Sequence, residues 1–142
     1  MKAIQNTSNS IVPAVVRVIV ALPILIIGVN HLVSPEAAMQ PLLEAAGLPL
    51  PALTARVAPV LEILGAVSLL TGAFSRVGAL LLSGAMAAAT ATHLIIAGKG
   101  LPWPNGEEND PGTAVPALLL VGAVFILWKG AGRWSLDRKA TQ

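Results

Sequence analysis

Long apolar segments alternate with short polar or turn-forming segments along this chain of 142 residues. About 20 consecutive apolar residues are enough for a helix to cross a bilayer. Each of the longest apolar segments meets or approaches that length. We therefore predict four transmembrane helices, which cover about residues 11–32, 54–74, 77–97 and 113–129.

A shorter segment, 35–46, follows the first predicted span. Ser34 and Pro35 form a typical helix start, and the segment is amphipathic but too short to cross a bilayer. The pattern thus predicts an all-α membrane protein, an antiparallel bundle of four transmembrane helices plus this short interfacial helix. Residues 11–130 would form one domain, with a polar tail (1–10) before it and a basic tail (131–142) after it.

The composition also indicates a membrane location: 55% of the residues are apolar, 11% are charged, and the mean hydropathy is +0.77. A soluble domain of this size could not cover so much apolar surface, whereas lipid can. The net charge of +2 does not indicate nucleic-acid binding, because the basic residues are scattered as flanks of the spans. The sequence has no cysteine, so this chain itself carries no disulfide relay or thiolate metal site.

The basic residues predict the orientation of the bundle. One side of the membrane would hold both termini together with Lys2, Arg76, Lys129, Arg133, Arg138 and Lys139. The other side would hold Arg56 and Lys99. Because cytoplasmic loops carry an excess of Lys and Arg, both termini are predicted to lie in the cytoplasm.

The ionisable residues within the predicted spans are Arg17, His31, Glu62 and His93. The helix rise places Glu62 about 3 Å, His93 about 9 Å and His31 about 14 Å from the midplane, all toward the outer side. Arg17 lies about 7 Å toward the inner side. An intramembrane acid is costly in lipid and marks a functional site by default. Glu62 is therefore the centre of the candidate site.

Several interpretations of these residues are open from the sequence. In a structural one, Glu62 pairs with Arg17 or with a histidine, because buried charges need partners. In a functional one, Glu62 and His93 line an outward-opening pocket and bind, or exchange protons with, a small ligand such as a quinone head group. A b-type haem is not favoured, because the depths of His31 and His93 differ by about 5 Å. Nothing in the spacing selects a metal site, so we predict none.

The third predicted span is rich in small residues. Ala79, Ser83, Ala87 and Ala91 recur at every fourth position, and Gly84 belongs to a neighbouring row. Such rows allow helix backbones to approach closely. We predict that these residues form a helix-packing face.

Several motifs, in their order and spacing, resemble the DoxX-like (DoxX/DoxD) family of small membrane proteins. They are Arg17, the stretch 27–32 (IGVNHL) and Pro35 in the first part; Glu62, Gly65, Leu70, Thr71, Gly72 and Arg76 around the second span; His93 at the end of the third; and the closing stretch 130–137 (GAGRWSLD). The resemblance extends over roughly residues 11–137. It implies a four-helix protein of the bacterial inner membrane.

The resemblance also implies redox-linked work, since relatives include a subunit of a thiosulfate:quinone oxidoreductase and a member that assembles with a superoxide dismutase and a sulfurtransferase. The family often has lysine at the position of His31, so the resemblance assigns no ligand role there. Our leading hypothesis is a membrane subunit or anchor of a redox or oxidative-stress system, linked to the quinone pool. Glu62 would be its key polar residue and Arg17 the charge partner of Glu62.

Two other classes of function are open: a non-catalytic membrane assembly or interaction factor, and a small lipophile-binding protein or transporter. Four spans without a sequence repeat or a broken helix do not favour transport. An independent catalyst is not favoured either, because the sequence has no nucleophile–base motif and no phosphate-binding loop. The predicted partners are the lipid bilayer, redox enzyme subunits and further copies of this chain.

Overall fold

The computed structural model describes residues 9–101, 103 and 112–139 of the chain. Every regular element among these residues is a helix. In chain order the elements are α2 (Ile11–Val33), α3 (Pro35–Ala38), α4 (Gln40–Ala46), α5 (Pro51–Thr71), α6 (Ser75–Gly98), α7 (Ala114–Lys129) and α8 (Leu136–Lys139).

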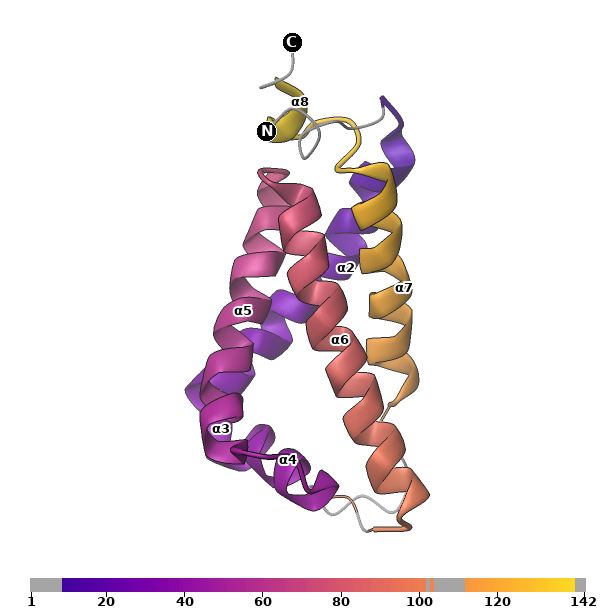
Figure 1. Ribbon diagram of the computed structural model, residues 1–142. Coiled ribbons are helices and arrows are strands. Elements are labelled where there is room, and N and C mark those ends of the chain that lie inside the picture. The colour runs from indigo at the N-terminus through magenta and orange to yellow at the C-terminus, as the bar shows by residue number, and fades with distance from the viewer. Residues whose placement is uncertain (1–8, 102, 104–111, 140–142) are drawn as a thin grey trace.

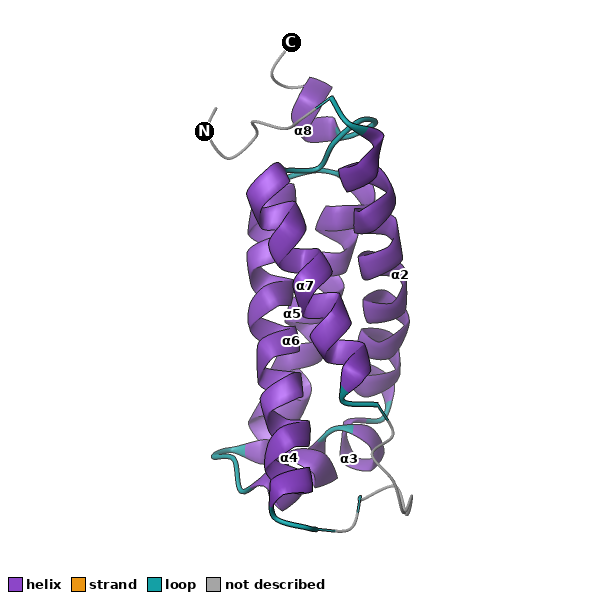
Figure 2. Ribbon diagram, turned by 90° about the vertical axis from the view of Figure 1, so that its right-hand side faces the viewer, coloured by secondary structure: helices purple, strands orange, loops and turns teal. Residues whose placement is uncertain are grey.

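The long helices α2, α5, α6 and α7 lie side by side and alternate in direction (Figures 1 and 2). α2 packs on α5, α5 on α6 and α6 on α7, and α7 also contacts α2. α5 and α6 are close together at the turn that joins them and diverge toward the opposite end, where α3 and α4 lie across the bundle (Figure 1). We call the end with the start of α2 and with α8 the terminal end, and the opposite end the α4 end.

The outer surface of the bundle is apolar. α2, α5 and α6, with 23, 21 and 24 residues, are long and apolar enough to span a membrane. α7 is also apolar but has 16 residues, which rise about 24 Å. Large hydrophobic side chains point outward, for example Ile26 (62% exposed) and Leu118 (71% exposed). Such a surface suits lipid and not water. The predicted all-helical membrane architecture is confirmed.

α5 begins and ends three residues earlier than predicted, at Pro51–Thr71 and not at 54–74. Pro51 lies in the first turn, where a missing N–H is tolerated. Gly72, with φ +69°, ends the helix and donates its N–H to carbonyls of the last turn. Pro59 therefore lies inside the helix and not in its first turns, so the carbonyl of Ala55 receives no helical hydrogen bond from it.

The predicted interfacial helix 35–46 is divided into α3 and α4 at Met39. Pro41 lies in the first turn of α4 and has no N–H with which to continue the helical hydrogen bonds of α3. The chain therefore ends one helix and begins another. Gly47, with φ +76°, ends α4 in the left-handed conformation that glycine favours.

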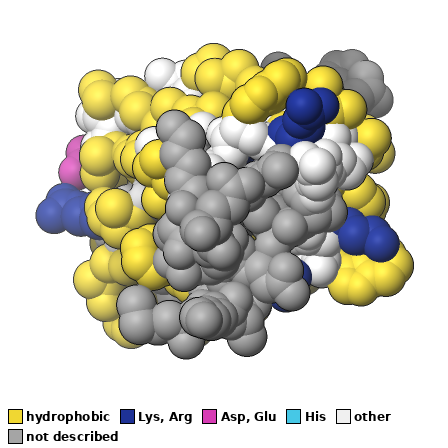
Figure 3. All heavy atoms as spheres, turned by 90° about the horizontal axis from the view of Figure 1, so that it is seen from above, with side chains coloured by type: hydrophobic (Ala, Val, Ile, Leu, Met, Phe, Trp, Pro, Cys, Tyr) yellow, Lys and Arg dark blue, Asp and Glu magenta, His cyan; other side chains and the backbone are white. Residues whose placement is uncertain are grey.

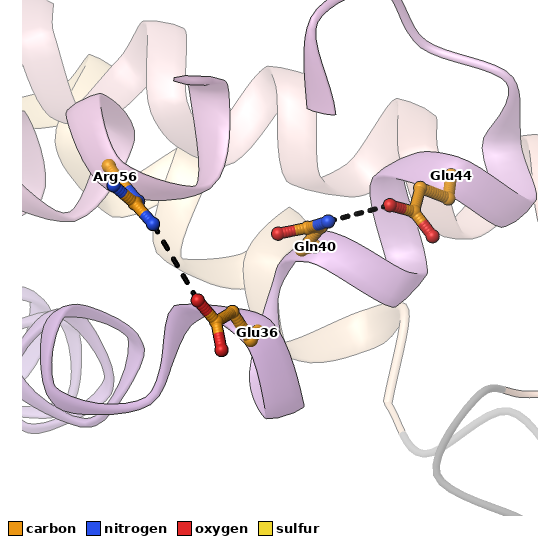
Figure 4. A network of polar contacts seen from close by, with 4 residues as sticks. All are labelled: Glu36, Gln40, Glu44 and Arg56. Atoms are coloured by element: carbon orange, nitrogen blue, oxygen red, sulfur yellow. Dashed lines mark hydrogen bonds and ion pairs between the residues drawn. The ribbon is translucent and has the colours of Figure 1, made fainter. Parts of the chain in front are cut away.

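An exposed ion pair links α3 to α5, and an exposed hydrogen bond links the two turns of α4 to each other (Figure 4). Arg56 Nη2 lies 3.6 Å from Glu36 Oε1, and the two side chains are 68% and 78% exposed. Gln40 Nε2 donates to Glu44 Oε1 at 2.7 Å. Exposed ion pairs contribute about 0–1 kcal/mol. The apolar contacts beneath α4, which include Ala46, Ile96 and Trp103, are the stronger attachment.

The main core lies between the four long helices, and α5 and α6 approach most closely at two glycines of this region. A Cβ atom on Gly65 would lie 2.8 Å from the side chain of Leu82. A Cβ atom on Gly78 would lie 2.7 Å from Cβ of Ser68. No side chain larger than the hydrogen atom of glycine fits at this crossing. The buried members of the core are Val20, Ala21, Ile24, Ala66, Leu69, Ala79, Leu82, Met86, Leu119, Ala123 and Ile126.

A pair of alanine substitutions on α6 tests this close approach. Gly78→Ala is expected to destabilise the protein by about 1–3 kcal/mol, because the methyl group overpacks the crossing with α5. Gly84→Ala is the matched control, because a Cβ atom there meets no atom within 4 Å. It is expected to stabilise α6 by about 0.5–1 kcal/mol through lost backbone entropy. Denaturant unfolding in micelles measures both, and equal effects would contradict the assignment.

The small-residue row of α6 is buried at one end only. Ala79 and Ser83 are buried, and Ser83 Oγ donates to the carbonyl of Ala79 at 2.7 Å. Gly84, Ala87 and Ala91 are exposed. Within the described part of the chain the row therefore packs only toward the terminal end. A row at every fourth position turns about 40° around the helix at each step, so its later members leave the buried face, which continues with Met86, Thr92 and Ile96. Packing by the exposed members stays a prediction.

The chain after α7 folds back over the terminal end. The carboxylate of Asp137 accepts hydrogen bonds from the backbone N–H groups of Phe74 at 2.7 Å and Ser75 at 2.8 Å. The N–H of Asp137 donates to the carbonyl of Gly72 at 2.8 Å. A carboxylate at a helix start satisfies N–H groups that the helix leaves unpaired. Residues 130–137 thus fasten the turn between α5 and α6.

Candidate functional site

A cavity of about 280 Å³ lies inside the bundle, between the level of Glu62 and the α4 end. Its lining is mostly apolar, and a cavity of this kind with a few convergent polar groups is the usual form of a small-molecule site. The polar side chains in it are His31, Glu62, Thr92 and His93. The full lining is Ile27, His31, Met39, Leu42, Leu43, Glu62, Met86, Ala89, Thr92, His93, Gly112, Val115, Pro116 and Leu119.

Glu62 lies near the middle of α5 and is 3% exposed. Its Oε2 atom lies 3.7 Å from Nδ1 of His31, which belongs to α2. Neither of these atoms has a hydrogen-bond partner among the described residues. Burial of a polar atom without a hydrogen bond is unfavourable by about 1–3 kcal/mol. The carboxylate and the imidazole can therefore both gain from contact with a ligand.

Gly28 explains how α2 comes so near to this carboxylate. A Cβ atom on Gly28 would lie 3.3 Å from Cβ of Glu62 and 3.5 Å from its Oε2. His31 follows three residues later and so lies on the same helix face. The contact that Gly28 allows between α2 and α5 therefore also brings His31 to Glu62.

His93 reaches the cavity from α6 and is held by an aromatic contact. Its ring centroid lies 5.2 Å from that of Trp103, with the ring planes at 56°. Trp103 is buried in the apolar cluster beneath α4. On the same side, Lys99 Nζ donates to the carbonyl of Ala46 at 2.9 Å and so caps the end of α4. Packing at the α4 end thus positions the second imidazole.

Arg17 does not belong to this site. It precedes His31 by 14 residues on α2, about 21 Å along the axis. Its Nη2 atom donates to the carbonyl of Trp134 at 2.6 Å, and Asp137 supplies the opposite charge that acts on it. The predicted pairing of Arg17 with Glu62 is therefore wrong, because the two residues lie at different depths. The alternative partner, a histidine, is the one that the structure places beside Glu62.

The three site residues that share the cavity can bind a polar group and exchange a proton with it. Carboxyl and imidazole groups act as hydrogen-bond donors or acceptors according to their protonation, and both serve widely as general acids and bases. Among the described residues, no three His, Cys, Asp or Glu side chains are placed to hold a metal ion together. The chemistry that the geometry offers is therefore polar recognition and proton exchange in an apolar cavity.

Residues 12–95 match the sequence model of the DoxX family. The match covers more than half of the chain and includes Arg17, His31, Glu62 and His93. The chain belongs to the DoxX family. The resemblance inferred from the motifs is thus confirmed, although the matched region ends before α7 and does not include the closing stretch 130–137.

An uncharacterized membrane protein of Mycobacterium tuberculosis, Rv3486, is similar to this DoxX protein. The two are 32% identical over 132 residues, which covers 89% of this chain and 80% of the relative. No solved structure matches the chain. The family and the apolar helices together make this DoxX chain a small multi-pass membrane protein.

Two groups of residues in this DoxX chain were not predicted from the sequence. The apolar lining from α4 and α7, such as Leu43 and Leu119, gave no signal, because apolar side chains that face a cavity and those that face lipid look alike in sequence. The role of Asp137 was also missed. A signal existed for it, since Asp137 is an acidic residue in a tail that is otherwise basic.

Proposed function

We propose that this DoxX protein is a membrane subunit or anchor of a redox or oxidative-stress system and that its cavity binds a quinone head group. The observation that carries the proposal is Glu62, a buried carboxylate in the middle of a membrane helix that lines a largely apolar cavity with His31 at 3.7 Å. In lipid such an acid is costly and is retained mainly for function.

The cavity fits the chemistry of a quinone ring. The ring is flat and apolar, and its oxygens accept hydrogen bonds in the oxidised form and donate them in the reduced form. The volume of about 280 Å³ is near the lower limit of ligand sites, about 300 Å³. It would hold the ring and leave the tail in lipid. Glu62 and His31 offer one polar contact, and His93 offers another from α6.

The chain would supply binding and proton exchange, while a partner would carry the electrons. Glu62 and His31 would hold the head group and give or take its protons. Because the sequence has no cysteine, any thiol oxidation coupled to the quinone would take place on the partner. This division of roles is what makes a subunit or anchor a better proposal than an independent enzyme.

For the location we propose the bacterial inner membrane, with four spans and both termini in the cytoplasm. Seen from above, basic side chains lie among hydrophobic ones at the edge of the molecule, one of them beside an acidic side chain (Figure 3). Lys129, at the end of α7, holds its Nζ atom 3.9 Å from the ring centre of Trp128, which is 71% exposed. Basic and aromatic residues of this kind are typical of a cytoplasmic membrane interface.

Glu62→Gln tests the head-group site. Glutamine keeps the shape of the side chain and removes its charge and its exchangeable proton. We expect the affinity for a short-chain quinone, titrated into purified protein in nanodiscs, to fall at least about tenfold, or about 1.4 kcal/mol. Glu44→Gln, on the exposed face of α4, is the matched control and should bind like the wild type. Equal affinity in all three proteins would refute the site.

Purification in mild detergent tests the subunit role. A redox enzyme recovered with the protein in fixed stoichiometry, identified by mass spectrometry, would support it. Recovery of the chain alone would refute the subunit role and leave a ligand-binding protein, the lipophile-binding alternative.

The exposed members of the small-residue row favour a second candidate, an assembly or interaction factor. Gly84, Ala87 and Ala91 present a flat face on α6 that the described chain does not cover. Small rows of this kind bring membrane helices together. In the same purification, a stable homo-oligomer, or a complex with a membrane protein that has no redox chemistry, would favour this candidate.

A further inference from the structure

The cavity beside Glu62 extends toward one end of the bundle only. Met86 and Leu119 belong both to its lining and to the main core, and so mark its floor. Toward the terminal end, α5 continues for nine residues after Glu62, about 14 Å. Over that length the space between the helices is filled by side chains such as Leu69 and Leu82, each 0% exposed. This layer separates Glu62 from the aqueous phase at the terminal end.

The hydroxyl groups of Ser68 and Ser83 in this layer are already engaged. The buried hydroxyl of Ser75 has no hydrogen-bond partner among the described residues, but Ser75 begins α6 and so lies at the terminal edge of the layer, away from Glu62. Ser68 Oγ donates to the carbonyl of Ala73 at 2.6 Å, and Ser83 Oγ donates to the carbonyl of Ala79 at 2.7 Å. A hydroxyl that donates its hydrogen to a backbone carbonyl is poorly placed to pass a proton along the bundle axis. The layer therefore offers a proton from Glu62 no ready route.

His31 connects Glu62 with the other side. It stands two residues before the end of α2, about 3 Å along the axis, and its side chain is 22% exposed. One ring nitrogen lies 3.7 Å from the carboxylate, and His31 both lines the cavity and belongs to the last turn of α2. The imidazole is thus the ionisable group that follows the buried acid in the direction of the α4 end.

Among the described residues, the other elements around the cavity bring one further titratable side chain, His93 of α6. The described lining residues from α4 and α7 carry none, and Glu62 is the titratable lining residue of α5. His93 is packed against Trp103 in the cluster beneath α4. Of the two imidazoles, only that of His31 has a ring nitrogen within 4 Å of the Glu62 carboxylate.

We propose that the proton of Glu62 equilibrates with the aqueous phase at the α4 end alone, through His31. The separation of 3.7 Å is slightly longer than a hydrogen bond. Transfer of the proton therefore requires a small rotation of either side chain, or one water molecule that bridges the two groups. The inference deepens the proposed function, because a head group bound beside Glu62 would exchange its protons on that side of the membrane. The route itself lies in this chain and needs no quinone.

Dicyclohexylcarbodiimide is a suitable probe, because it crosses membranes and reacts with a carboxyl group only in the protonated form. The carboxyl O–H adds across one C=N bond, and the acyl group then migrates to nitrogen, so the product keeps all atoms of both reactants. The full chain is placed in liposomes with known orientation, and impermeant buffers set the pH separately on each side. Mass spectrometry of the peptide that contains Glu62 measures the label.

We expect labelling to follow the pH at the α4 end and to ignore the pH at the terminal end. Once the carboxyl group is mostly ionised, labelling should fall about tenfold for each unit of pH rise. His31→Phe should flatten this dependence, and so should His31→Gln, which keeps a polar side chain in case the phenylalanine variant fails to fold. His93→Phe is the matched control on the same cavity and should retain it. Glu62→Gln gives the unlabelled baseline.

Three outcomes would overturn the proposal: labelling that follows the pH at the terminal end, labelling that follows both sides equally, and a dependence that both His31 variants leave unchanged. Because no quinone takes part, the result does not depend on the head-group titration. A chain that fails to bind quinone but shows one-sided labelling would refute the proposed ligand and support the proton route.

Discussion

Asp137→Ala is expected to destabilise the folded protein by about 2–6 kcal/mol, because two backbone N–H groups lose their acceptor and each such loss costs about 1–3 kcal/mol. Asp137 is 4% exposed and holds two backbone N–H groups at the start of α6. It also supplies the negative charge that acts on buried Arg17. The substitution leaves the N–H groups of Phe74 and Ser75 without their acceptor at the terminal end of the bundle. Denaturant unfolding in mixed micelles measures the loss.

Two further variants give this prediction its control. Glu36→Ala removes an acid that is mostly exposed and paired with Arg56 on the surface, so its effect should not exceed about 1 kcal/mol. Asp137→Asn keeps one side-chain oxygen as an acceptor and should fall between the two. If Asp137→Ala proves no worse than Glu36→Ala, residues 130–137 do not fasten the terminal end.

The sequence was sufficient to predict the long helices because lipid imposes their length and composition. The helix boundaries were harder to predict from the sequence, since they depend on local backbone features. α5 starts at Pro51, before the predicted span 54–74, and the segment 35–46 divides because Pro41 interrupts its hydrogen bonds. Both prolines are visible in the sequence. Whether each starts, kinks or divides a helix depends on how the flanking residues pack.

For the candidate site, the ionisable character of individual residues was a better guide than the predicted pairs of residues. His31, Glu62 and His93 were recognisable as ionisable residues within apolar segments, and the structure brings all three to one cavity. The pairing of Arg17 with Glu62 followed from the need of a buried charge for a partner, although the predicted depths of the two residues already differed by about 10 Å. Hydrogen bonding to Trp134, more than 100 positions later in the chain, could not be read from either segment.

The small-residue row of α6 shows the same limit. A row at every fourth position indicates where a helix can approach, but the direction of the neighbouring helix decides how much of the row is used. The row also turns about 40° around α6 at each step, so its later members are exposed while Met86 and Thr92 are buried. α5 and α6 diverge toward the α4 end (Figure 1), and the cavity lies in that part of the bundle.

Glu62→Met is expected to stabilise the protein by about 1–3 kcal/mol, because it removes a buried carboxyl oxygen that has no hydrogen-bond partner among the described residues. The same substitution should abolish quinone binding in the nanodisc titration, since the group that recognises the head group is gone. A gain in stability combined with a loss of binding indicates a residue that serves function and lowers the stability of the fold.

Arg17→Met is the matched comparison within the same bundle. It should lower stability, because the carbonyl of Trp134 loses its hydrogen-bond donor and Asp137 loses the positive charge that acts on it. The molecules that remain folded should bind quinone with unchanged affinity, because Arg17 lies about 21 Å along α2 from the cavity residue His31. The two buried charges would then separate by role, Arg17 for the fold and Glu62 for the ligand. A loss of stability in both variants would instead make Glu62 a structural residue, paired with His31 only to be tolerated in the membrane.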